Sequence, residues 1–596
     1  MSSQLIEVVV PGPWWNALTY EAPFVPEPGS RVRVPVGRGE RIGFAVGPAR
    51  ERPEAALRSV REVLDERSPL GAELWELMCW VGRTFLCGTG MVLKTACPAK
   101  FLEGAPLDVP LSGEREGRAE GDAFCEEHCF APWDEARAAF YRAALERPCR
   151  TLVLFSEAAT ARRFFASLPA HLKAEAVLWP SSGGKKLWEV WREVRAGNAR
   201  IVVAPPGGVY APMAPGQIVV DEEASPAYVP QRVPRVSARS VAGRRASLLG
   251  ARLILGGRMP SSKTFLRAHP VCEVLPNRDR MVFADIRRSL KGRERGVEGN
   301  LPLTVSLLDR TRRELERGRH VLWMLDRMGE AAEVFCVECG HSPRCPRCGG
   351  VMRSESSGQA LRCIHCGRRE PLPERCPDCR GGLWSGRRPG LEALASMAGR
   401  LMPEYPVLLH EGGKTKALEV PSLLLGTRGA LALCDRLDVG LAAWLDLDAE
   451  LRRPEYGARF RAFSMVWESY WRGRRDGDEP AGRTVLIQGR RFGAEWRAIL
   501  SGGWERFWRG ELALRSELAL PPVGLMIQID LPEGEDRAEA CRALEEAGLF
   551  VMDPGEPGSP LWVNAPSSEP VARALAPRFA IGRSRLHFPS VTVWAE

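Results

Sequence analysis

The sequence lacks the hydrophobic segments that would direct or anchor a chain in a membrane. Its first residues, MSSQLIEVVVPGPWW, hold no basic segment followed by an apolar core, so we expect no signal peptide. No run of about 18 apolar residues occurs, which argues against a membrane span. Of the 17 cysteines, the nine outside one dense cluster are scattered without a pairing pattern, as is typical of a reducing compartment. We therefore expect a cytoplasmic protein with no membrane partner.

The sequence also lacks a phosphate-binding loop. The motif G-x-x-x-x-G-K-[ST] does not occur. The nearest candidates are GGKT at 412–415 and SGGKK at 182–186, and both lack the first glycine of the loop. The backbone amides and the lysine of this loop provide the main electrostatic support for a bound triphosphate. The sequence therefore predicts no conventional site for ATP.

Charge and composition restrict the function only weakly. The 83 basic and 74 acidic residues leave a net charge of +9, a small excess for 596 residues and weak support for a polyanionic partner. A hydrophobic content of 45% is that of an ordinary globular protein. At this length we expect about three to five domains.

The sequence does contain a dense cysteine cluster at 336–379. Its eight cysteines form four C-x-x-C pairs, a spacing at which two thiolates bind one side of a tetrahedral metal ion. Eight thiolates complete two zinc sites, and such closed sites are structural because no position is open to water or substrate. The spacing alone permits three ways of combining the pairs. The pairs are Cys336/Cys339, Cys345/Cys348, Cys363/Cys366 and Cys376/Cys379.

Periodicity and turn signals divide the chain into five segments. Short apolar runs that alternate with helical patterns predict parallel sheets in two α/β units. A charged, glycine-rich stretch before the first of these units predicts a linker. The segments are a β-rich domain at 1–100, a linker at 101–145, an α/β unit at 146–285, a second α/β unit at 286–484 with the cysteine cluster inserted at 336–384, and an α+β domain at 485–596.

One predicted strand of the first α/β unit ends in acidic residues. The run QIVVDEE places Asp221, Glu222 and Glu223 at the C-terminal end of a buried strand, which is where parallel sheets bind ligands. In nucleoside triphosphatases this position supplies a carboxylate for Mg²⁺ and a glutamate that orients water. A solvated turn is the alternative interpretation.

The order of these parts resembles the bacterial PriA family (primosomal protein N′), the replication restart helicases, over nearly the whole chain. The cysteine block is the most specific match, because the family also carries it inside the second helicase lobe. VVDEEASPAY at 219–228 is similar to helicase motif II, and RVRVPVGRGERIG at 31–43 to the signature of a domain that captures a DNA 3′ end. The resemblance implies a multidomain α/β fold with two RecA-like lobes, a zinc-binding insertion in the second lobe, a β-rich N-terminal DNA-binding domain and a C-terminal α+β domain.

The resemblance also implies roles for individual residues. Nested pairing would place one zinc on Cys336, Cys339, Cys376 and Cys379, and the other on Cys345, Cys348, Cys363 and Cys366. The residues implied for DNA binding are Tyr20, Gly37, Arg38 and Arg58, the last at a position that the family fills with lysine. The region at 101–145 would be a reduced form of the family's winged helix.

The chain departs from the family in its motor motifs. CFAPWDEARAA stands where the phosphate loop would lie, and GGRMPSS at 256–262 replaces GSATPS. ESYWRGRR at 468–475 replaces QVAGRAGR and keeps Arg472 and Arg475. In the N-terminal domain, Leu18-Thr19 stands where the family has Phe-Asp before the tyrosine. The motor is therefore altered in several separate motifs. Asp221 and Glu222 of motif II remain unchanged.

Three functions follow from this pattern. The leading hypothesis is a replication restart protein that binds forked or single-stranded DNA and its 3′ ends, and helps to reload the replication machinery without ATP-driven unwinding. Its partners by resemblance are primosome proteins and single-stranded-DNA-binding proteins. The first alternative is an active ATP-dependent 3′→5′ DNA helicase that binds ATP and Mg²⁺ at a non-consensus site. The second is an interaction scaffold that recruits partners through its zinc module.

Overall fold

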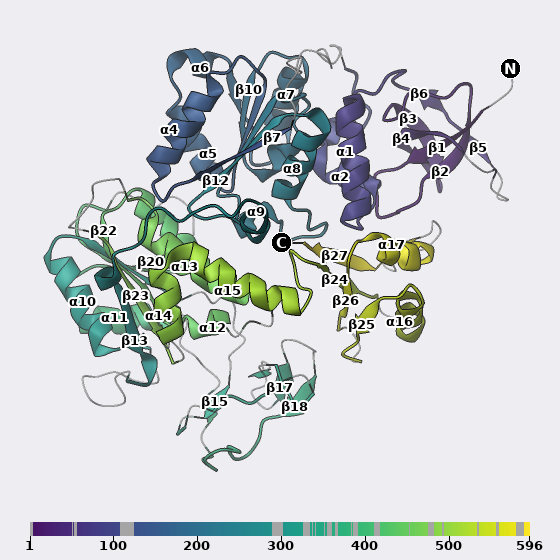
Figure 1. Cartoon of the computed structure of the whole chain (residues 1–596). Coiled ribbons are helices and arrows are strands. Elements are labelled where there is room, and N and C mark those ends of the chain that lie inside the picture. Colours follow the sequence, from purple (N-terminus) through teal and green to yellow (C-terminus); the bar gives the residue numbers. More distant parts are fainter. Residues whose placement is uncertain are drawn as a thin grey trace.

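The structure is a computed structural model that contains two stacked α/β lobes, with one smaller domain beside each lobe and a cysteine-rich module at one end (Figure 1). None of the helices in the described part of the chain is long and apolar enough to cross a membrane. The described residues are 4–49, 52, 57–107, 124–288, 302–325, 334–385 (without 337, 340, 348, 351, 355–359, 364–367 and 383), 391–410, 418–474 (without 452 and 454), 482–490, 494–532, 536–555, 559–579 and 589–595.

The N-terminal domain is a curled six-stranded sheet with the order β5-β2-β1-β4-β3-β6, followed by three helices. Its strands alternate between core and surface residues, which is why the sequence pattern predicts them. The predicted β-rich N-terminal domain is confirmed. Its elements are β1 (Gln4–Val9), β2 (Leu18–Ala22), β3 (Arg31–Val36), β4 (Gly39–Pro48), β5 (Arg58–Ser59), β6 (Glu62–Val63), α1 (Gly71–Thr84), α2 (Thr89–Ala96) and α3 (Ala99–Leu102).

The first lobe is a six-stranded parallel sheet with the order β7-β12-β11-β8-β10-β9. Alternate strand residues pack against α4 and α5 on one face, and against α7 and α8 on the other. Both faces are therefore buried, as is usual for parallel sheets. The elements are β7 (Cys125–Phe130), α4 (Asp134–Leu145), β8 (Thr151–Phe155), α5 (Ala158–Ala166), α6 (Ala170–Ala174), β9 (Ala176–Leu178), α7 (Lys185–Arg195), β10 (Ile201–Ala204), β11 (Gln217–Asp221), α8 (Ala238–Leu249), β12 (Arg252–Gly257) and α9 (Ser262–Ala268).

The start of this lobe differs from the prediction. Residues 125–145, expected to belong to a linker, form β7 and α4 of the first lobe. β7 is an edge strand that pairs only with β12, and its sequence CEEHCF is polar because its residues are half-buried or exposed. A strand with one covered side does not show the continuous apolar run that identifies its buried neighbours.

The second lobe is also a six-stranded parallel sheet, with the order β13-β23-β22-β14-β21-β20. The cysteine-rich module lies between β14 and α11 and is an insertion in this lobe. The elements of the lobe are β13 (Met281–Asp285), α10 (Val305–Glu316), β14 (His320–Met324), α11 (Leu391–Leu401), β20 (Val407–His410), β21 (Leu423–Gly426), β22 (Val439–Trp444), α12 (Asp448–Leu451), α13 (Ala458–Trp471), β23 (Thr484–Gly489), α14 (Ala494–Ser501) and α15 (Gly503–Glu517). Those of the module are β15 (Phe335–Cys336), β16 (Met352–Ser354), β17 (Ala360–Cys363), β18 (Arg369–Pro371) and β19 (Trp384–Ser385).

Both ends of the second lobe differ from the predicted boundaries. β13 was expected in the first α/β unit and β23 in the C-terminal domain, but the two strands pair with each other in the second sheet. The reason is that strands far apart in sequence can be neighbours in a sheet, and this pairing has no local signal. The segment that ends at Glu517 therefore belongs to the second lobe.

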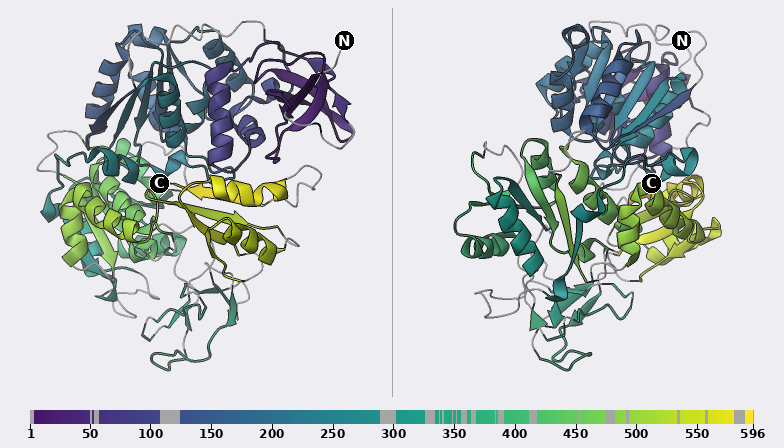
Figure 2. Two further views of the ribbon diagram at one scale, coloured as in Figure 1. Left: turned by 45° about the vertical axis from the view of Figure 1, so that its right-hand side comes forward. Right: turned by 60° about the vertical axis from the view of Figure 1, so that its left-hand side comes forward.

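The C-terminal domain is a four-stranded antiparallel sheet with the order β25-β26-β24-β27, packed against two helices. Its buried side chains form one continuous apolar cluster with those of α1, α2 and one face of the first lobe. Figure 2 shows this domain between the N-terminal domain and the second lobe. Its elements are β24 (Leu525–Asp530), α16 (Arg537–Glu546), β25 (Phe550–Met552), β26 (Leu561–Ala565), α17 (Glu569–Leu575) and β27 (Ser590–Trp594).

A buried arginine joins the N-terminal domain to the first lobe. Arg245 of α8 is fully buried, and its guanidinium donates to the Glu73 carboxylate of α1 at 3.0 and 3.1 Å. It also donates to the carbonyl oxygens of Val209 and Ala211, at 2.7 and 3.0 Å, and to that of Met213. All these groups lose their hydrogen bonds to water on folding. The hydrogen bonds from Arg245 replace them.

We expect Arg245→Met to lower the free energy of unfolding by about 3–5 kcal/mol, because it leaves a buried carboxylate without its cation. Urea denaturation followed by far-UV circular dichroism measures the change. Arg244→Met is the matched control, since Arg244 lies next in the helix, is 36% exposed and reaches Glu76 only at 3.7 Å. Its effect should stay below about 1 kcal/mol. Equal effects of the two substitutions would contradict a specific role for Arg245.

Candidate functional site

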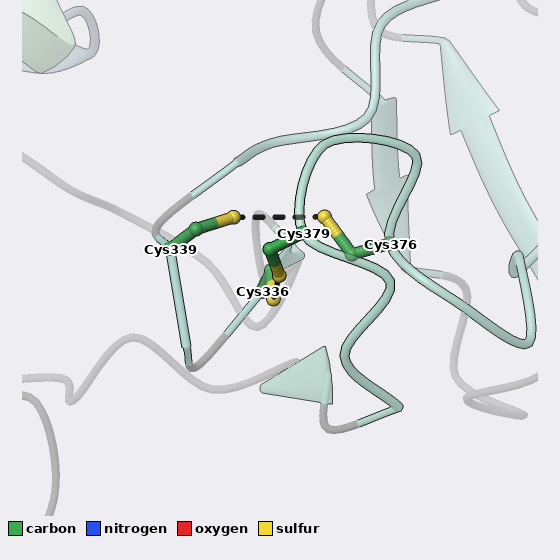
Figure 3. A group of neighbouring side chains, drawn as sticks. All are labelled: Cys336, Cys339, Cys376 and Cys379. Carbon is green, nitrogen blue, oxygen red and sulfur yellow. Dashed lines mark hydrogen bonds between the residues drawn. The ribbon is translucent and has the colours of Figure 1, made fainter.

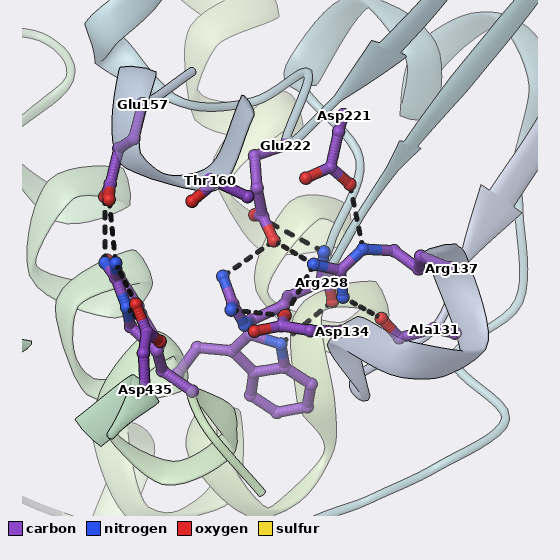
Figure 4. A network of polar contacts seen from close by, with 12 residues as sticks. Ala131, Asp134, Arg137, Glu157, Thr160, Asp221, Glu222, Arg258 and Asp435 are labelled. Carbon is purple, nitrogen blue, oxygen red and sulfur yellow. Dashed lines mark hydrogen bonds and ion pairs between the residues drawn. The ribbon is translucent and has the colours of Figure 1, made fainter. Parts of the chain in front are cut away.

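The two acidic residues predicted at a strand end are held by arginines of the same lobe. Asp221 ends β11, and Arg137 of α4 donates to its Oδ1 at 3.0 Å and to Glu222 Oε1 at 2.7 Å (Figure 4). Arg258, which follows β12, donates to Glu222 Oε1 at 2.6 Å. Tyr141 of α4 donates to Asp221 Oδ1 at 2.9 Å. The solvated-turn interpretation is therefore wrong, because Asp221 is 4% exposed and Arg137 is 2% exposed.

The charge of this cluster is almost balanced by its own side chains. Asp134 accepts from both Arg137 and Arg258. Burial opposes the ionisation of Asp134, but Arg258 and Arg137 outweigh it and lower its pKa to about 2. Burial raises the pKa of Glu222, and the same two arginines offset part of that rise. We call Asp134, Arg137, Asp221, Glu222 and Arg258 the first-lobe network.

The turn before α4 offers no cradle for phosphate. Pro132 has no N–H group, and the N–H of Ala131 already donates to the Gly257 carbonyl at 3.2 Å. The Ala131 carbonyl accepts from Arg137 Nη1 at 2.7 Å. The first turn of α4 carries Asp134 and Glu135. Their negative charges interact favourably with the helix dipole but would repel a phosphate. The turn before this helix thus uses the backbone groups of Ala131 within the protein, and the first helical turn is acidic.

Arg472, the predicted arginine of the second lobe, points into the same interlobe region. It lies at the C-terminal end of α13 and donates to Glu157 of the first lobe at 2.7 and 2.8 Å. It also donates to Asp435 at 2.9 and 3.0 Å and to Glu468 at 2.7 Å. Burial opposes ionisation of Glu468, yet Arg428 and Arg472 lower its pKa to about 2. Arg475 lies outside the described residues.

Sequence reasoning identified the acids of β11 and Arg472 but not their partners. Arg137 and Arg258 lie in CFAPWDEARAA and GGRMPSS, the two segments that stand in place of motor motifs. Glu157 and Arg472 are 315 residues apart, and no spacing rule connects such positions. The one local signal was the Asp134-x-x-Arg137 spacing, which predicts an ion pair along a helix.

The cysteine module brings together four of the predicted ligands (Figure 3). The Sγ atoms of Cys336 and Cys379 lie 3.5 Å apart, and those of Cys339 and Cys376 lie 3.6 Å apart. All four sulfur atoms lie within 4.8 Å of one another. Four thiolates around one zinc would lie about 3.8 Å apart, given Zn–S bonds of about 2.3 Å in a tetrahedron. The cluster therefore fits a zinc ion, and it combines the outer two pairs, as the nested arrangement requires.

The first cysteine of each C-x-x-C unit makes the same backbone hydrogen bond. In each unit the backbone N–H of the first cysteine donates to the carbonyl oxygen five residues later. These bonds join Cys336 to His341, Cys345 to Gly350, Cys363 to Arg368 and Cys376 to Gly381, at 2.7 or 2.8 Å. A hydrogen bond from the Cys339 N–H also lowers the pKa of the Cys336 thiol to about 7, which favours the thiolate form that binds metal.

The inner two pairs are described in part. Cys345 and Cys363 are both buried and belong to one small apolar cluster with Met352 and Leu361. Cys348 and Cys366 lie outside the described residues.

The predicted DNA-binding residues lie together at one edge of the N-terminal domain. Gly37 occupies the β3–β4 turn with φ of +61°, a conformation that favours glycine. Arg58 donates to the Gly37 carbonyl at 2.9 Å, and Arg38 is exposed beside it. Tyr20 pairs with Arg58 between β2 and β5, is 4% exposed, and donates to the Pro35 carbonyl at 2.9 Å. The arrangement presents two guanidinium groups and a glycine turn above a buried tyrosine.

Comparisons with known proteins agree with this arrangement. Residues 7–98 match the PriA 3′DNA-binding domain (3′BD) family. The chain is 25% identical to the replication restart protein PriA of Bacillus subtilis over 414 residues, which cover 66% of this chain and 50% of that protein. It is 31% identical to the probable PriA of Deinococcus radiodurans over 271 residues, 43% of this chain and 29% of that protein. It is 24% identical to the PriA of Treponema pallidum over 581 residues, 88% of this chain and 87% of that protein.

Fold and matches together define a multidomain α/β protein with an N-terminal domain of a type that binds DNA ends. The predicted resemblance to the PriA family is thereby confirmed, because residues 7–98 match its 3′DNA-binding domain and PriA replication restart proteins match much of the chain. The matched segments span half of the Bacillus relative and 29% of the Deinococcus relative.

We expect Arg137→Met to lower the free energy of unfolding by about 3–5 kcal/mol, because Asp221 and Glu222 would remain buried without their cation. Chemical denaturation of the full chain measures the loss. Arg142→Met is the control on the same helix, because Arg142 pairs with Glu135, which is 76% exposed. An Arg137→Met protein as stable as the parent would contradict this role, because it would show that Asp221 and Glu222 do not need the cation.

We expect Cys339→Ser to lose one equivalent of zinc per chain, because one of the four thiolates around the ion is missing. Metal content after gel filtration measures this, and cobalt substitution should give the intense visible bands of tetrahedral thiolate coordination in the parent protein. Cys125→Ser is the control, since Cys125 is an exposed thiol of β7. Unchanged zinc in Cys339→Ser would exclude the four-cysteine site.

Proposed function

We propose that this protein is a replication restart protein that binds DNA at stalled or branched forks and helps to reload the replication machinery without ATP-driven unwinding. We take its two lobes as RecA-like helicase lobes whose nucleotide position has been lost. One observation carries the proposal: Arg137 and Arg258 already pair with the carboxylates that would hold Mg²⁺ and orient water in a motor.

ATP with its Mg²⁺ would compete with the arginines of the first-lobe network for the same carboxylates. A triphosphate with its Mg²⁺ would have to separate Asp221 and Glu222 from two buried guanidinium groups. Breaking a buried ion pair costs about 3–5 kcal/mol, and each 1.4 kcal/mol weakens binding about tenfold. The first-lobe network would therefore weaken ATP binding by about a hundredfold to several thousandfold. The missing phosphate loop removes the contacts that could offset this penalty.

DNA recognition is assigned to the N-terminal domain. Arg38 and Arg58 would contact the terminal phosphates, and the open turn at Gly37 leaves room for the chain end, because nothing lies within 4 Å of a Cβ placed there. Tyr20 would support this site from below. Binding that depends on guanidinium–phosphate contacts falls steeply as salt rises.

The zinc module is assigned a structural role with two ions. The second zinc would be held by Cys345, Cys348, Cys363 and Cys366, a proposal supported by the equivalent backbone hydrogen bond at the first cysteine of every pair. Each ion would close its loop from both ends and stabilise a module with a small apolar core. The exposed surface of this module is where we place contacts with primosome and single-stranded-DNA-binding proteins.

We expect no ATP hydrolysis above background, with or without forked DNA, while fluorescence anisotropy shows tight binding to a fork with a free 3′-hydroxyl. Coupled phosphate release measures hydrolysis on the full chain. DNA-stimulated hydrolysis that disappears in Asp221→Asn would contradict the proposal and favour an active helicase.

The same anisotropy assay tests the DNA-end site. Arg58→Ala should reduce the preference for a fork with a free 3′ end over a fork whose 3′ end is closed in a hairpin by at least about fivefold, the effect of losing one charge-assisted hydrogen bond to a terminal phosphate. Arg61→Ala is the control, because Arg61 is an exposed arginine of the same domain that faces Glu40 at 3.6 Å. It should weaken both forks equally. An unchanged preference in Arg58→Ala would remove the end-binding assignment.

A further inference from the structure

The contact between the two lobes contains an aromatic core. Phe130 of the first lobe packs against Trp504 of the second with ring centres 6.3 Å apart, and Trp133 packs against Trp471 at 6.1 Å. Phe265 of α9 meets Trp504 at 6.1 Å. These first-lobe rings belong to, or pack against, the same apolar cluster that fills one side of the second lobe. This part of the interlobe contact is therefore largely apolar.

Two tryptophans of the second lobe also bind the backbone of the first. Trp467 of α13 donates its indole N–H to the Arg258 carbonyl at 3.0 Å. Trp508 of α15 donates to the Pro260 carbonyl at 2.9 Å. Both indole rings are 1% exposed, and both acceptors lie in the segment that joins β12 to α9. This segment is held by two helices of the opposite lobe.

Ion pairs add a third connection between the lobes. Arg472 of the second lobe binds Glu157 of the first with two hydrogen bonds, at 2.7 and 2.8 Å. Arg163 of the first lobe reaches Asp435 of the second at 3.0 Å. Aromatic packing, backbone hydrogen bonds and ion pairs thus act on the same pair of lobes and use different residues.

Lobes that open and close around a ligand need an interface whose closed form depends on that ligand. Here the protein's own side chains supply every contact described above. We infer that the two lobes form one rigid body, which is closed without nucleotide and keeps its geometry when DNA binds. The inference rests on the proposed function for the identity of the lobes, and it adds that the protein presents a surface of fixed shape to its DNA.

Hydrogen exchange of the full chain, followed by mass spectrometry, tests this rigidity. The double variant Trp467→Phe/Trp508→Phe keeps two aromatic rings but loses both indole donors to the first lobe. Amides of residues 257–265 should exchange at least about fivefold faster, the factor expected for losing an ordinary hydrogen bond. Trp444→Phe is the matched control, because its indole N–H donates at 2.9 Å to Ser469 within the second lobe. It should leave 257–265 unchanged.

Single-molecule energy transfer measures the lobe positions directly. Azide-bearing amino acids at the exposed positions 174 and 316 carry one dye on each lobe. We expect one narrow distance distribution, unchanged by ATP, by a non-hydrolysable ATP analogue and by forked DNA. Two populations, or a shift with any of these ligands, would overturn the inference.

The two proposals fail in different ways. ATP hydrolysis with an unchanged distance distribution would contradict the proposed function and leave the rigid body intact. A distance that shifts on DNA binding without hydrolysis would overturn the rigid body and leave the proposed function intact. Equal exchange at 257–265 in the double variant and the parent would also overturn the inference.

Discussion

The neutralisation of two carboxylates at the end of one parallel strand determines much of this structure. Asp221 and Glu222 lie where a buried negative charge needs a cation. A motor protein takes that cation from a metal–nucleotide ligand, whereas this chain takes it from Arg137 and Arg258. The position of α4, the turn at Ala131 and the segment after β12 all follow from bringing those two guanidinium groups to the strand end. The cations at this strand end are thereby supplied by the protein's own side chains.

Local patterns predicted the parts of the protein whose physics is local. The C-x-x-C spacing predicted a four-cysteine metal site, and the alternating strands predicted the N-terminal domain, because both signals lie within a few residues. The polar edge strand β7 and the place of β23 in the second sheet were not predicted, since both depend on neighbours distant in sequence. The same limit applies to the site: Asp221 and Arg472 were found, but Arg137, Arg258 and Glu157 are recognisable only from the folded chain.

The cysteine module obtains its order differently from the rest of the chain. The two lobes bury large apolar clusters on both faces of their sheets, whereas the module has one small cluster around Met352 and Leu361. Repeated backbone hydrogen bonds at the four cysteine pairs add local order to this small core. The cluster of Cys336, Cys339, Cys376 and Cys379 also brings the first and last pairs of the module together.

The apolar cluster shared by α1, the first lobe and the C-terminal domain has a consequence for how the chain can be divided. The domains are separate in topology but share one interior, so a fragment cut between them would expose an apolar face to water and tend to aggregate. The shared interior also fixes directions. A DNA end bound at the turn of Gly37 would enter at a constant angle to both lobes. The protein would thereby fix the direction of one strand relative to the rest of the fork.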